Sequence, residues 1–203
     1  MDALPERPRR RRAATVERLL DAALETFADI GFAAASVEDI CSRGGFTRGA
    51  FYSSFRTKDE LFAALFARET ARNVALAEEQ LAGIEQEADP LTAGVERCLA
   101  AFRAERTWVL VLTEYRLHAA RHPEAAAALH EHVAALHARL TALIEVVAAR
   151  AGLTFTVPAG QLARAVLAVH DGVVLSQVPS PDVVPDELEK TALLLLLRAA
   201  TTP

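Results

Sequence analysis

Apolar residues recur at helical spacing along most of this 203-residue chain, and glycine and proline separate the stretches in which they do so. The first stretch predicts a helix over residues 13–30, which Gly31 ends. Further helices are predicted over residues 58–87, 90–102, 107–121, 123–150, 158–178 and 185–200. Residues 153–157 are too short and isolated for a sheet, so we expect a loop there. The pattern therefore predicts an all-α protein.

Two shorter helices joined by a glycine-containing turn are predicted within residues 36–58, which is a helix-turn-helix signature. Ser36 stands where an N-cap belongs, and Asp39, three residues later, completes a capping box. Gly44 and Gly45 end this helix, because glycine adopts a positive φ at little steric cost. Thr47 is expected to cap the second helix.

The second of these helices has an apolar face and a polar face. Phe51 and Phe55 stand four residues apart and are expected to point inward. The other faces hold Thr47, Arg48, Gly49, Ala50, Tyr52, Ser53 and Ser54. A small, polar surface with one basic residue suits a DNA groove, so we expect this segment to bind DNA.

The segment from about Thr15 to Leu65 resembles the DNA-binding region of the TetR family of bacterial transcriptional regulators. The matching positions are Leu19, Leu20, Ala22, Ala23, Phe27, Gly31, Phe32, Ser36, Val37, Ile40, Gly45, Phe46, Thr47, Gly49, Tyr52, Phe55, Lys58, Leu61 and Phe62. Cys41 and Ser54 depart from the pattern, where the family usually has alanine and often histidine, respectively. The resemblance implies an N-terminal three-helix domain with the helix-turn-helix, followed by a helical domain for ligand binding and dimerisation.

Contacts to DNA are assigned from the helix-turn-helix pattern and the resemblance together. The residues expected at base edges are Thr47, Arg48, Ala50 and Ser53. Ser36, Tyr52 and Lys58 are expected to hold phosphates. Val37, Gly49 and Ser54 complete the predicted interface with the double-stranded operator.

Lys58 is expected in the first turn of a helix that Thr57 and Glu60 begin with a second capping box. A lysine in a first turn opposes the helix dipole, and a DNA phosphate beside the helix N-terminus explains its presence there. The alternative is a free surface lysine.

The net charge of −5 is unevenly distributed along the chain. Residues 1–68 hold 11 basic and 10 acidic residues, whereas residues 69–203 hold 11 and 17. Basic residues of the first part are concentrated in a run that contains Arg7, Arg9, Arg10, Arg11 and Arg12. We expect this arm to be disordered without a polyanion and to enter a minor groove or follow phosphates. The alternative is a solvated tail.

The predicted organisation is a flexible basic arm over residues 1–12, a helix-turn-helix domain over 13–66 and a helical effector-binding and dimerisation domain over 67–203. No apolar run of about 18 residues and no signal peptide is evident, so we expect a cytoplasmic protein without a membrane partner. Cys41 and Cys98 form no CxxC motif. No metal signature, phosphate loop or nucleophile motif is visible, so we expect no metal, no cofactor and no enzyme activity.

One face of the helix predicted to begin at Thr107 is apolar and aromatic with polar groups at its edge. It carries Trp108, Val111, Leu112 and Tyr115, with Phe102 just upstream. This face suits a pocket for a small-molecule effector, although core packing explains it nearly as well. His170 and Asp171 form a polar pair in an apolar helix and are expected either to orient a ligand or to lie at a dimer seam. His118 and His122 lack a third ligand, so we interpret them as structural.

The last two predicted helices carry more apolar surface than one packing face uses. The candidate interface residues are Val166, Val173, Val174, Leu193, Leu194 and Leu197. Burial against a second copy of the chain explains the excess, and the alternative is a larger core within one chain. The resemblance implies a four-helix dimer bundle, and a two-fold dimer would bind a pseudo-palindromic operator.

These features together indicate a homodimeric, ligand-responsive transcriptional regulator. The resemblance implies a repressor that a small hydrophobic effector releases from its operator. The first alternative is a constitutive architectural DNA-binding dimer without an effector. A helical enzyme is the second alternative, and the missing catalytic constellation weakens it.

Overall fold

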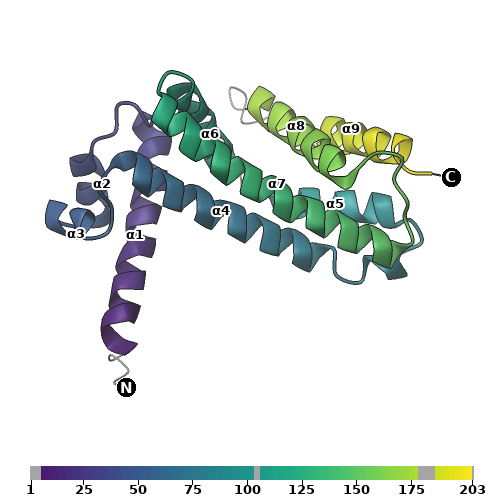
Figure 1. The fold of residues 1–203 in the computed structure, drawn as a ribbon, viewed down its shortest axis with the longest axis horizontal. Helices are drawn as coiled ribbons and strands as arrows, with labels where there is room; N and C mark the ends of the chain where they lie inside the picture. Colours follow the sequence, from purple (N-terminus) through teal and green to yellow (C-terminus); the bar gives the residue numbers. More distant parts are fainter. Residues whose placement is uncertain (1–5, 103–105, 178–185, 203) are drawn as a thin grey trace. The chain divides into compact units, whose positions relative to one another are not determined.

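A computed structural model of the chain describes residues 6–102, 106–177 and 186–202. Within these residues the fold is all-α, as predicted, with 81% helix, nine α-helices and no strand (Figure 1). The helices are α1 (Glu6–Ile30), α2 (Val37–Gly44), α3 (Arg48–Tyr52), α4 (Lys58–Gln80), a short 3-10 helix η1 (Ile84–Gln86), α5 (Pro90–Phe102), α6 (Arg106–Ala119), α7 (Pro123–Ala151), α8 (Ala159–Gln177) and α9 (Asp186–Ala199).

The described residues pack as two units. The helix-turn-helix unit contains the chain up to Arg68 together with Val111–Leu129, and the C-terminal unit contains Glu69–Leu110 and the chain from His130 onward. Helices α4, α6 and α7 therefore have residues in both units. The domain limit after residue 66 stays a prediction. Residues 111–129, which the sequence placed in the second domain, pack with the first unit.

Aromatic rings fill the centre of the helix-turn-helix unit. Phe32 is 1% exposed, and its ring centroid lies 5.1 Å from that of Phe27 and 5.7 Å from that of Phe62. Tyr115 of α6 stacks on Phe62, with ring centroids 3.6 Å apart and planes at 9°. Such pairs contribute about 0.5–1.5 kcal/mol each beyond their burial. A segment of α6 thus completes the core formed by α1 and α4.

Polar contacts hold the turn that follows α1. Gly31 has a φ of +82°, a conformation that other residues rarely adopt, and a Cβ at this position would lie 2.9 Å from a carboxylate oxygen of Glu114, so glycine is favoured here. The Glu114 carboxylate accepts a hydrogen bond from the Phe32 amide at 2.8 Å. The Lys58 ammonium group donates to the carbonyl oxygens of Phe32 and Ala35 at 2.5 and 2.7 Å. Charged side chains of α6 and α4 therefore bind both backbone polar groups of Phe32.

Helix α9 joins the elements of the C-terminal unit, because it contacts both α5 and α8. Arg198 near its end donates to Asp89, which precedes α5, at 2.8 Å. Near its start, Glu189 is 4% exposed and lies 2.7 Å from Nδ1 of His170 on α8. Polar contacts at both ends therefore hold α9 in place.

The helix limits differ from the predicted ones at two main points. Helix α1 begins at Glu6 rather than at residue 13, so residues 6–12 continue the helix where a flexible arm was predicted. Repulsion between like charges favoured an arm, but arginine is also a good helix former. Helix α4 ends at Gln80 rather than near residue 87, because the chain turns there and Gly83 adopts a φ of +71°.

Helix α7 is, among the described residues, the one helix whose length and composition would allow it to cross a membrane, where the sequence had indicated none. The mean hydropathy of its most apolar 18-residue window is 1.3, and none of that window is buried. Alanine accounts for much of this value, and Glu131 and Arg139 also lie in the helix. A single helix of this kind is weak evidence for a membrane protein.

Replacing Glu114 by alanine should lower the free energy of unfolding by about 1–3 kcal/mol, because the Phe32 amide in this part-buried turn would lose its acceptor. Urea denaturation followed by circular dichroism measures the change. Glu78→Ala is the control, since Glu78 is exposed on α4 and alanine favours a helix. Equal unfolding free energies for the two variants would contradict this role of Glu114.

Candidate nucleic-acid interface

The sequence of helix α2 fixes both of its ends. The Ser36 hydroxyl accepts a hydrogen bond from the Asp39 amide at 3.2 Å, and the Asp39 carboxylate accepts one from the Ser36 amide at 2.9 Å, which confirms the predicted capping box. Hydrogen bonds from the Ser36 hydroxyl and amide hold the pKa of Asp39 below its usual value. Because the hydroxyl also donates to Asp39 at 2.5 Å, the group predicted to hold a phosphate is bonded within the protein. Gly45, at a φ of +69°, ends the helix.

Helix α3 begins after Thr47, whose hydroxyl accepts a hydrogen bond from the Ala50 amide at 3.2 Å, as predicted. Phe51 is 0% and Phe55 7% exposed, which confirms that both point inward. Among the residues predicted to contact DNA, those that are exposed are Thr47, Arg48, Gly49, Tyr52 and Ser53, and those that are half-buried are Ser36, Val37, Ala50, Ser54 and Lys58. The outer face of α3, beside α2, is thus open to solvent (Figure 1).

Arg48 carries the one positive charge of α3, and it is paired. Its Nη1 lies 2.5 Å from Oε1 of Glu38 on α2, and its guanidinium carbon lies 5.8 Å from the ring centroid of Tyr52. A hydrogen bond to Tyr52 and then the charge of Glu38 raise the pKa of Arg48, so the group stays cationic. Glu38 was missed from the sequence, because no local pattern marks a partner ten positions away.

Arg12 connects α1 to the end of α3. Its Nη2 donates to the carbonyl oxygen of Ser53 at 3.2 Å. Arg9, Arg10 and Arg11 belong to the same helix, but their side chains lie outside the described residues. A helix rises about 1.5 Å per residue, so the backbone of this run lies within about 5 Å of Arg12 along the axis. The continuous helix therefore holds the arginine run near the end of α3.

Lys58 begins α4, as predicted, but its ammonium group is engaged within the fold. Besides the bonds to Phe32 and Ala35, it lies 3.5 Å from the carbonyl oxygen of Ala33 and 4.4 Å from the centre of the Phe32 ring. Burial lowers the pKa of Lys58. An ammonium group has three N–H donors, and all of them have acceptors in the turn. The predicted phosphate contact stays a prediction, and it requires the ammonium group to leave these carbonyl groups.

The predicted capping box at the start of α4 occurs in a shifted form. The Thr57 hydroxyl accepts a hydrogen bond from the Glu60 amide at 3.0 Å. The Glu60 carboxylate, however, accepts from the amide of Arg56 at 2.8 Å rather than from that of Thr57. The Arg56 guanidinium adds a bond at 3.2 Å, and these bonds lower the pKa of Glu60. The helix still begins at Lys58, but the Glu60 side chain binds the backbone one residue earlier than predicted.

Two arginines beside the helix-turn-helix were not predicted to have a role. Arg18 of α1 donates to the carbonyl oxygen of Gly44 at 3.1 Å and lies 4.8 Å above the ring of Phe46. Arg43 near the end of α2 pairs with Asp29 of α1. Both contacts hold α2 against α1, and both join residues that are distant in sequence.

The residues predicted to line an effector pocket are divided between the two units. Trp108, Val111, Leu112 and Tyr115 are all buried, but Trp108 belongs to the C-terminal unit and the other three belong to the helix-turn-helix unit. The Tyr115 hydroxyl donates to Asp59 at 3.1 Å, and burial raises the pKa of Tyr115. For Tyr115 the structure favours core packing, the alternative explanation. The Phe102 side chain lies outside the described residues.

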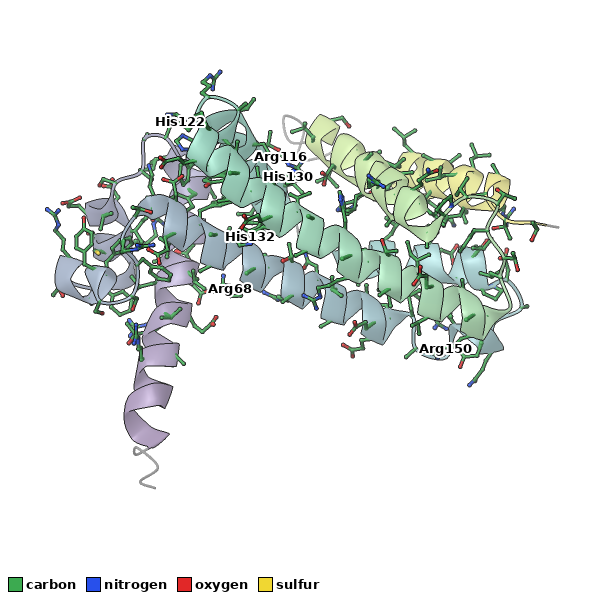
Figure 2. The ribbon with its side chains drawn as sticks, viewed as in Figure 1. Arg68, Arg116, His122, His130, His132 and Arg150 are labelled. Carbon is green, nitrogen blue, oxygen red and sulfur yellow. The ribbon has the colours of Figure 1, made fainter. Side chains whose placement is uncertain are left out.

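The pair His118 and His122 and the pair His170 and Asp171 lie in different surroundings. His118 and His122 stack with ring centroids 4.0 Å apart, and Nε2 of His118 lies 3.3 Å from Asp59 (Figure 2 labels His122). Within the described residues, no group of three His, Cys, Asp or Glu side chains is placed to hold a metal ion. His170 is bonded to the buried Glu189, and Asp171 beside it is half-buried. A role of His170 and Asp171 at a ligand or a dimer seam stays a prediction.

Two of the residues predicted for a dimer interface are buried within the chain itself. Val173 is 9% and Leu193 6% exposed, whereas the other four, Val166, Val174, Leu194 and Leu197, are half-buried. Leu188 and Leu195 are 65% and 67% exposed instead. They stand seven residues apart, so they share one face of α9. The sequence could not single them out, because the leucine run around Leu195 is apolar on every face.

Comparisons with known proteins agree with this geometry. The model of the family described as bacterial regulatory proteins, tetR family, matches residues 19–65. The HTH-type transcriptional repressor Rv1474c of Mycobacterium tuberculosis is 40% identical over 65 residues, which are 32% of this chain and 35% of that protein. The chain thus matches about a third of this curated relative.

Two solved structures extend the likeness in fold to most of the chain. A putative TetR-family transcriptional regulator from Mesorhizobium loti has a TM-score of 0.74 at 17% identity, and the match covers 95% of this chain and 99% of that one. The regulator FadR from Bacillus subtilis, solved in complex with stearoyl-CoA, has a TM-score of 0.70 at 17% identity, with 89% and 96% covered. At this identity the likeness concerns the fold.

Lys58→Ala should lower the midpoint of thermal unfolding by several degrees, because the turn would lose a donor worth about 1–3 kcal/mol, or roughly 2–4 °C per kcal/mol at this size. Lys190→Ala is the control, since Lys190 forms a surface pair with Glu96. Differential scanning calorimetry compares the two. An unchanged midpoint together with a DNA-binding salt slope reduced by about 0.9 would assign Lys58 to a phosphate instead.

Proposed function

We propose that the chain is a DNA-binding transcriptional regulator of the tetR family of bacterial regulatory proteins and that it acts as a repressor. The observation that carries this proposal is the open outer face of α3, which presents Arg48 beside a capped and well-packed α2. A short helix held in this way by a preceding helix fits the major groove of DNA. The net charge of residues 1–68 is close to zero, with 11 basic and 10 acidic residues. Specific contacts to bases, rather than general attraction to the phosphates, would therefore select the operator.

The DNA contacts divide into two kinds. Thr47, Arg48 and Ser53 would face base edges, together with the half-buried Ala50. Tyr52 and the arginine run at the start of α1 would hold phosphates, which set the position of α3 on the duplex. Binding to the operator also implies that the protein works in the cytoplasm.

We further propose that the regulator is a homodimer whose interface includes α8 and α9. Leu188 and Leu195 leave apolar surface on one face of α9, and Leu194 and Leu197, which lie on other faces, are half-buried. Exposed apolar surface of this kind is typical of an interface between subunits. A two-fold dimer would present two copies of α3 to a pseudo-palindromic operator.

The proposed signal is a small hydrophobic effector bound in the C-terminal unit. Support comes from FadR of Bacillus subtilis, which has a similar fold and was solved with stearoyl-CoA. Binding would favour a position of α4 that separates the two copies of α3 and lowers affinity for the operator. A typical coupling of this kind is about 1–3 kcal/mol. A constitutive architectural dimer, the alternative, would keep its operator affinity in the presence of every acyl-CoA tested.

Selection from a random duplex library should enrich one pseudo-palindromic sequence, bound by two chains per duplex. Arg48→Ala should then reduce the preference at one base pair of each half-site by about 1–3 kcal/mol, because a bidentate base contact is lost. Fluorescence anisotropy against single-base variants measures this, with Arg139→Ala on the exposed surface of α7 as the control. A library without an enriched sequence would refute the proposed function.

Leu195→Glu should raise the dimer dissociation constant at least about tenfold, since a carboxylate would be buried in an apolar interface. Sedimentation velocity across protein concentrations measures the constant. Leu117→Glu is the matched control, because Leu117 of α6 is 54% exposed and lies outside the proposed interface. Dimers of equal strength in both variants would exclude this face of α9.

A further inference from the structure

Glu38 is a negative charge on the surface that is proposed to approach DNA. It stands in the first turn of α2, with its side chain 55% exposed, and its carboxylate lies 2.5 Å from Nη1 of Arg48. A carboxylate in this place opposes binding to phosphates, which carry the sequence-independent part of DNA affinity. The contact with Arg48 therefore bears directly on how α3 binds.

The fold does not depend on this ion pair. Both side chains are more than half exposed, and exposed ion pairs contribute little to stability. The α2 helix is capped by Ser36 and Asp39, and α3 is capped by Thr47. Removal of the Glu38 charge thus leaves the elements that hold α2 and α3 unchanged.

The pair does fix the guanidinium group of Arg48. Its Nη1 contacts the Glu38 carboxylate, and its guanidinium carbon lies 5.8 Å from the ring centroid of Tyr52. A free arginine side chain samples many rotamers, and part of this entropy is lost on binding. An arginine that is oriented before binding loses less, and with one N–H bonded to Glu38 and one to Tyr52, three further donors remain on the group.

We propose that Glu38 is a positioning residue that orients Arg48 for bidentate hydrogen bonding to a guanine and neutralises its charge toward phosphates. The acceptors O6 and N7 of guanine carry no formal charge, so the paired guanidinium group still binds them. Binding to a phosphate depends mainly on its negative charge, and the Glu38–Arg48 pair, which has no net charge, attracts a phosphate only weakly. Glu38 thereby raises the ratio of specific to non-specific affinity. This inference rests on the proposed function.

The experiment compares the full-length wild type with Glu38→Gln, Arg48→Ala and the double variant. Fluorescence anisotropy measures binding to the selected operator, to operators with the guanine replaced, and to an unrelated duplex, across salt. Glu124→Gln is the charge-matched control, because Glu124 is an exposed residue of the helix-turn-helix unit at the start of α7. Thermal unfolding of each variant checks that the fold is unchanged.

Glu38→Gln should bind the unrelated duplex about 3–10 times more tightly, with a salt slope steeper by about 0.9, because Arg48 is free to pair with a phosphate. The preference for the guanine should fall by a similar factor, since Arg48 is no longer oriented. In the Arg48→Ala background, the same change should alter the guanine preference less than about twofold, because coupling through Arg48 is gone. Glu124→Gln should leave the guanine preference as in the wild type.

Two results would overturn the role of Glu38 alone. In the first, the wild type selects a clear operator, but Glu38→Gln changes neither the guanine preference nor the affinity for the unrelated duplex. The other is a change at a different base pair that persists in the Arg48→Ala background, which would make Glu38 a direct acceptor for the amino group of a cytosine. A wild type that prefers no sequence would overturn the proposed function itself, and Glu38 with it.

Discussion

The helix-turn-helix unit depends on the turn between α1 and α2, where Phe32 is held by its ring and by both of its backbone polar groups. The ring is buried among Phe27, Phe62 and Tyr115. The amide donates to Glu114, and the carbonyl oxygen accepts from Lys58. Buried backbone groups without partners cost free energy, so these two charged side chains allow a turn to lie inside the core. The position of α2, and through it that of α3, follows from this turn.

Four arginines of the described part of the helix-turn-helix unit already have partners within the protein. Arg12 and Arg18 donate to carbonyl oxygens, while Arg43 and Arg48 pair with carboxylates. The basic and acidic residues of positions 1–68 also nearly cancel, at 11 and 10. Binding to DNA would therefore exchange partners rather than add free charge. An exchange of this kind favours sequences that offer well-placed acceptors over sequences that offer phosphates alone.

The sequence predicted what local physics decides. The caps at Ser36 and Thr47, the inward Phe51 and the start of α4 depend on residues a few positions apart, and each is confirmed. The contacts of Glu38 and Tyr115 were beyond prediction, because their partners are set by how helices pack. The start of α1, which lies within a run of arginines, was also predicted wrongly, since helix propensity and charge repulsion oppose each other there. The contacts with DNA themselves stay predictions.

Helix α6 forms hydrogen bonds at this turn and at the start of α4. Under the proposed function, these bonds are a route by which a signal would reach α2. Glu114 bonds the Phe32 amide at 2.8 Å, and Tyr115 bonds Asp59 at 3.1 Å. A donor and an acceptor about 3.6 Å apart no longer form a hydrogen bond, so a shift of α6 by about 1 Å away from these partners would break both bonds. The loss of one such bond to a charged group costs about 1–3 kcal/mol. That is comparable to the coupling free energy of a typical allosteric protein, so under the proposed function these bonds could carry a coupling of the usual size to the turn before α2.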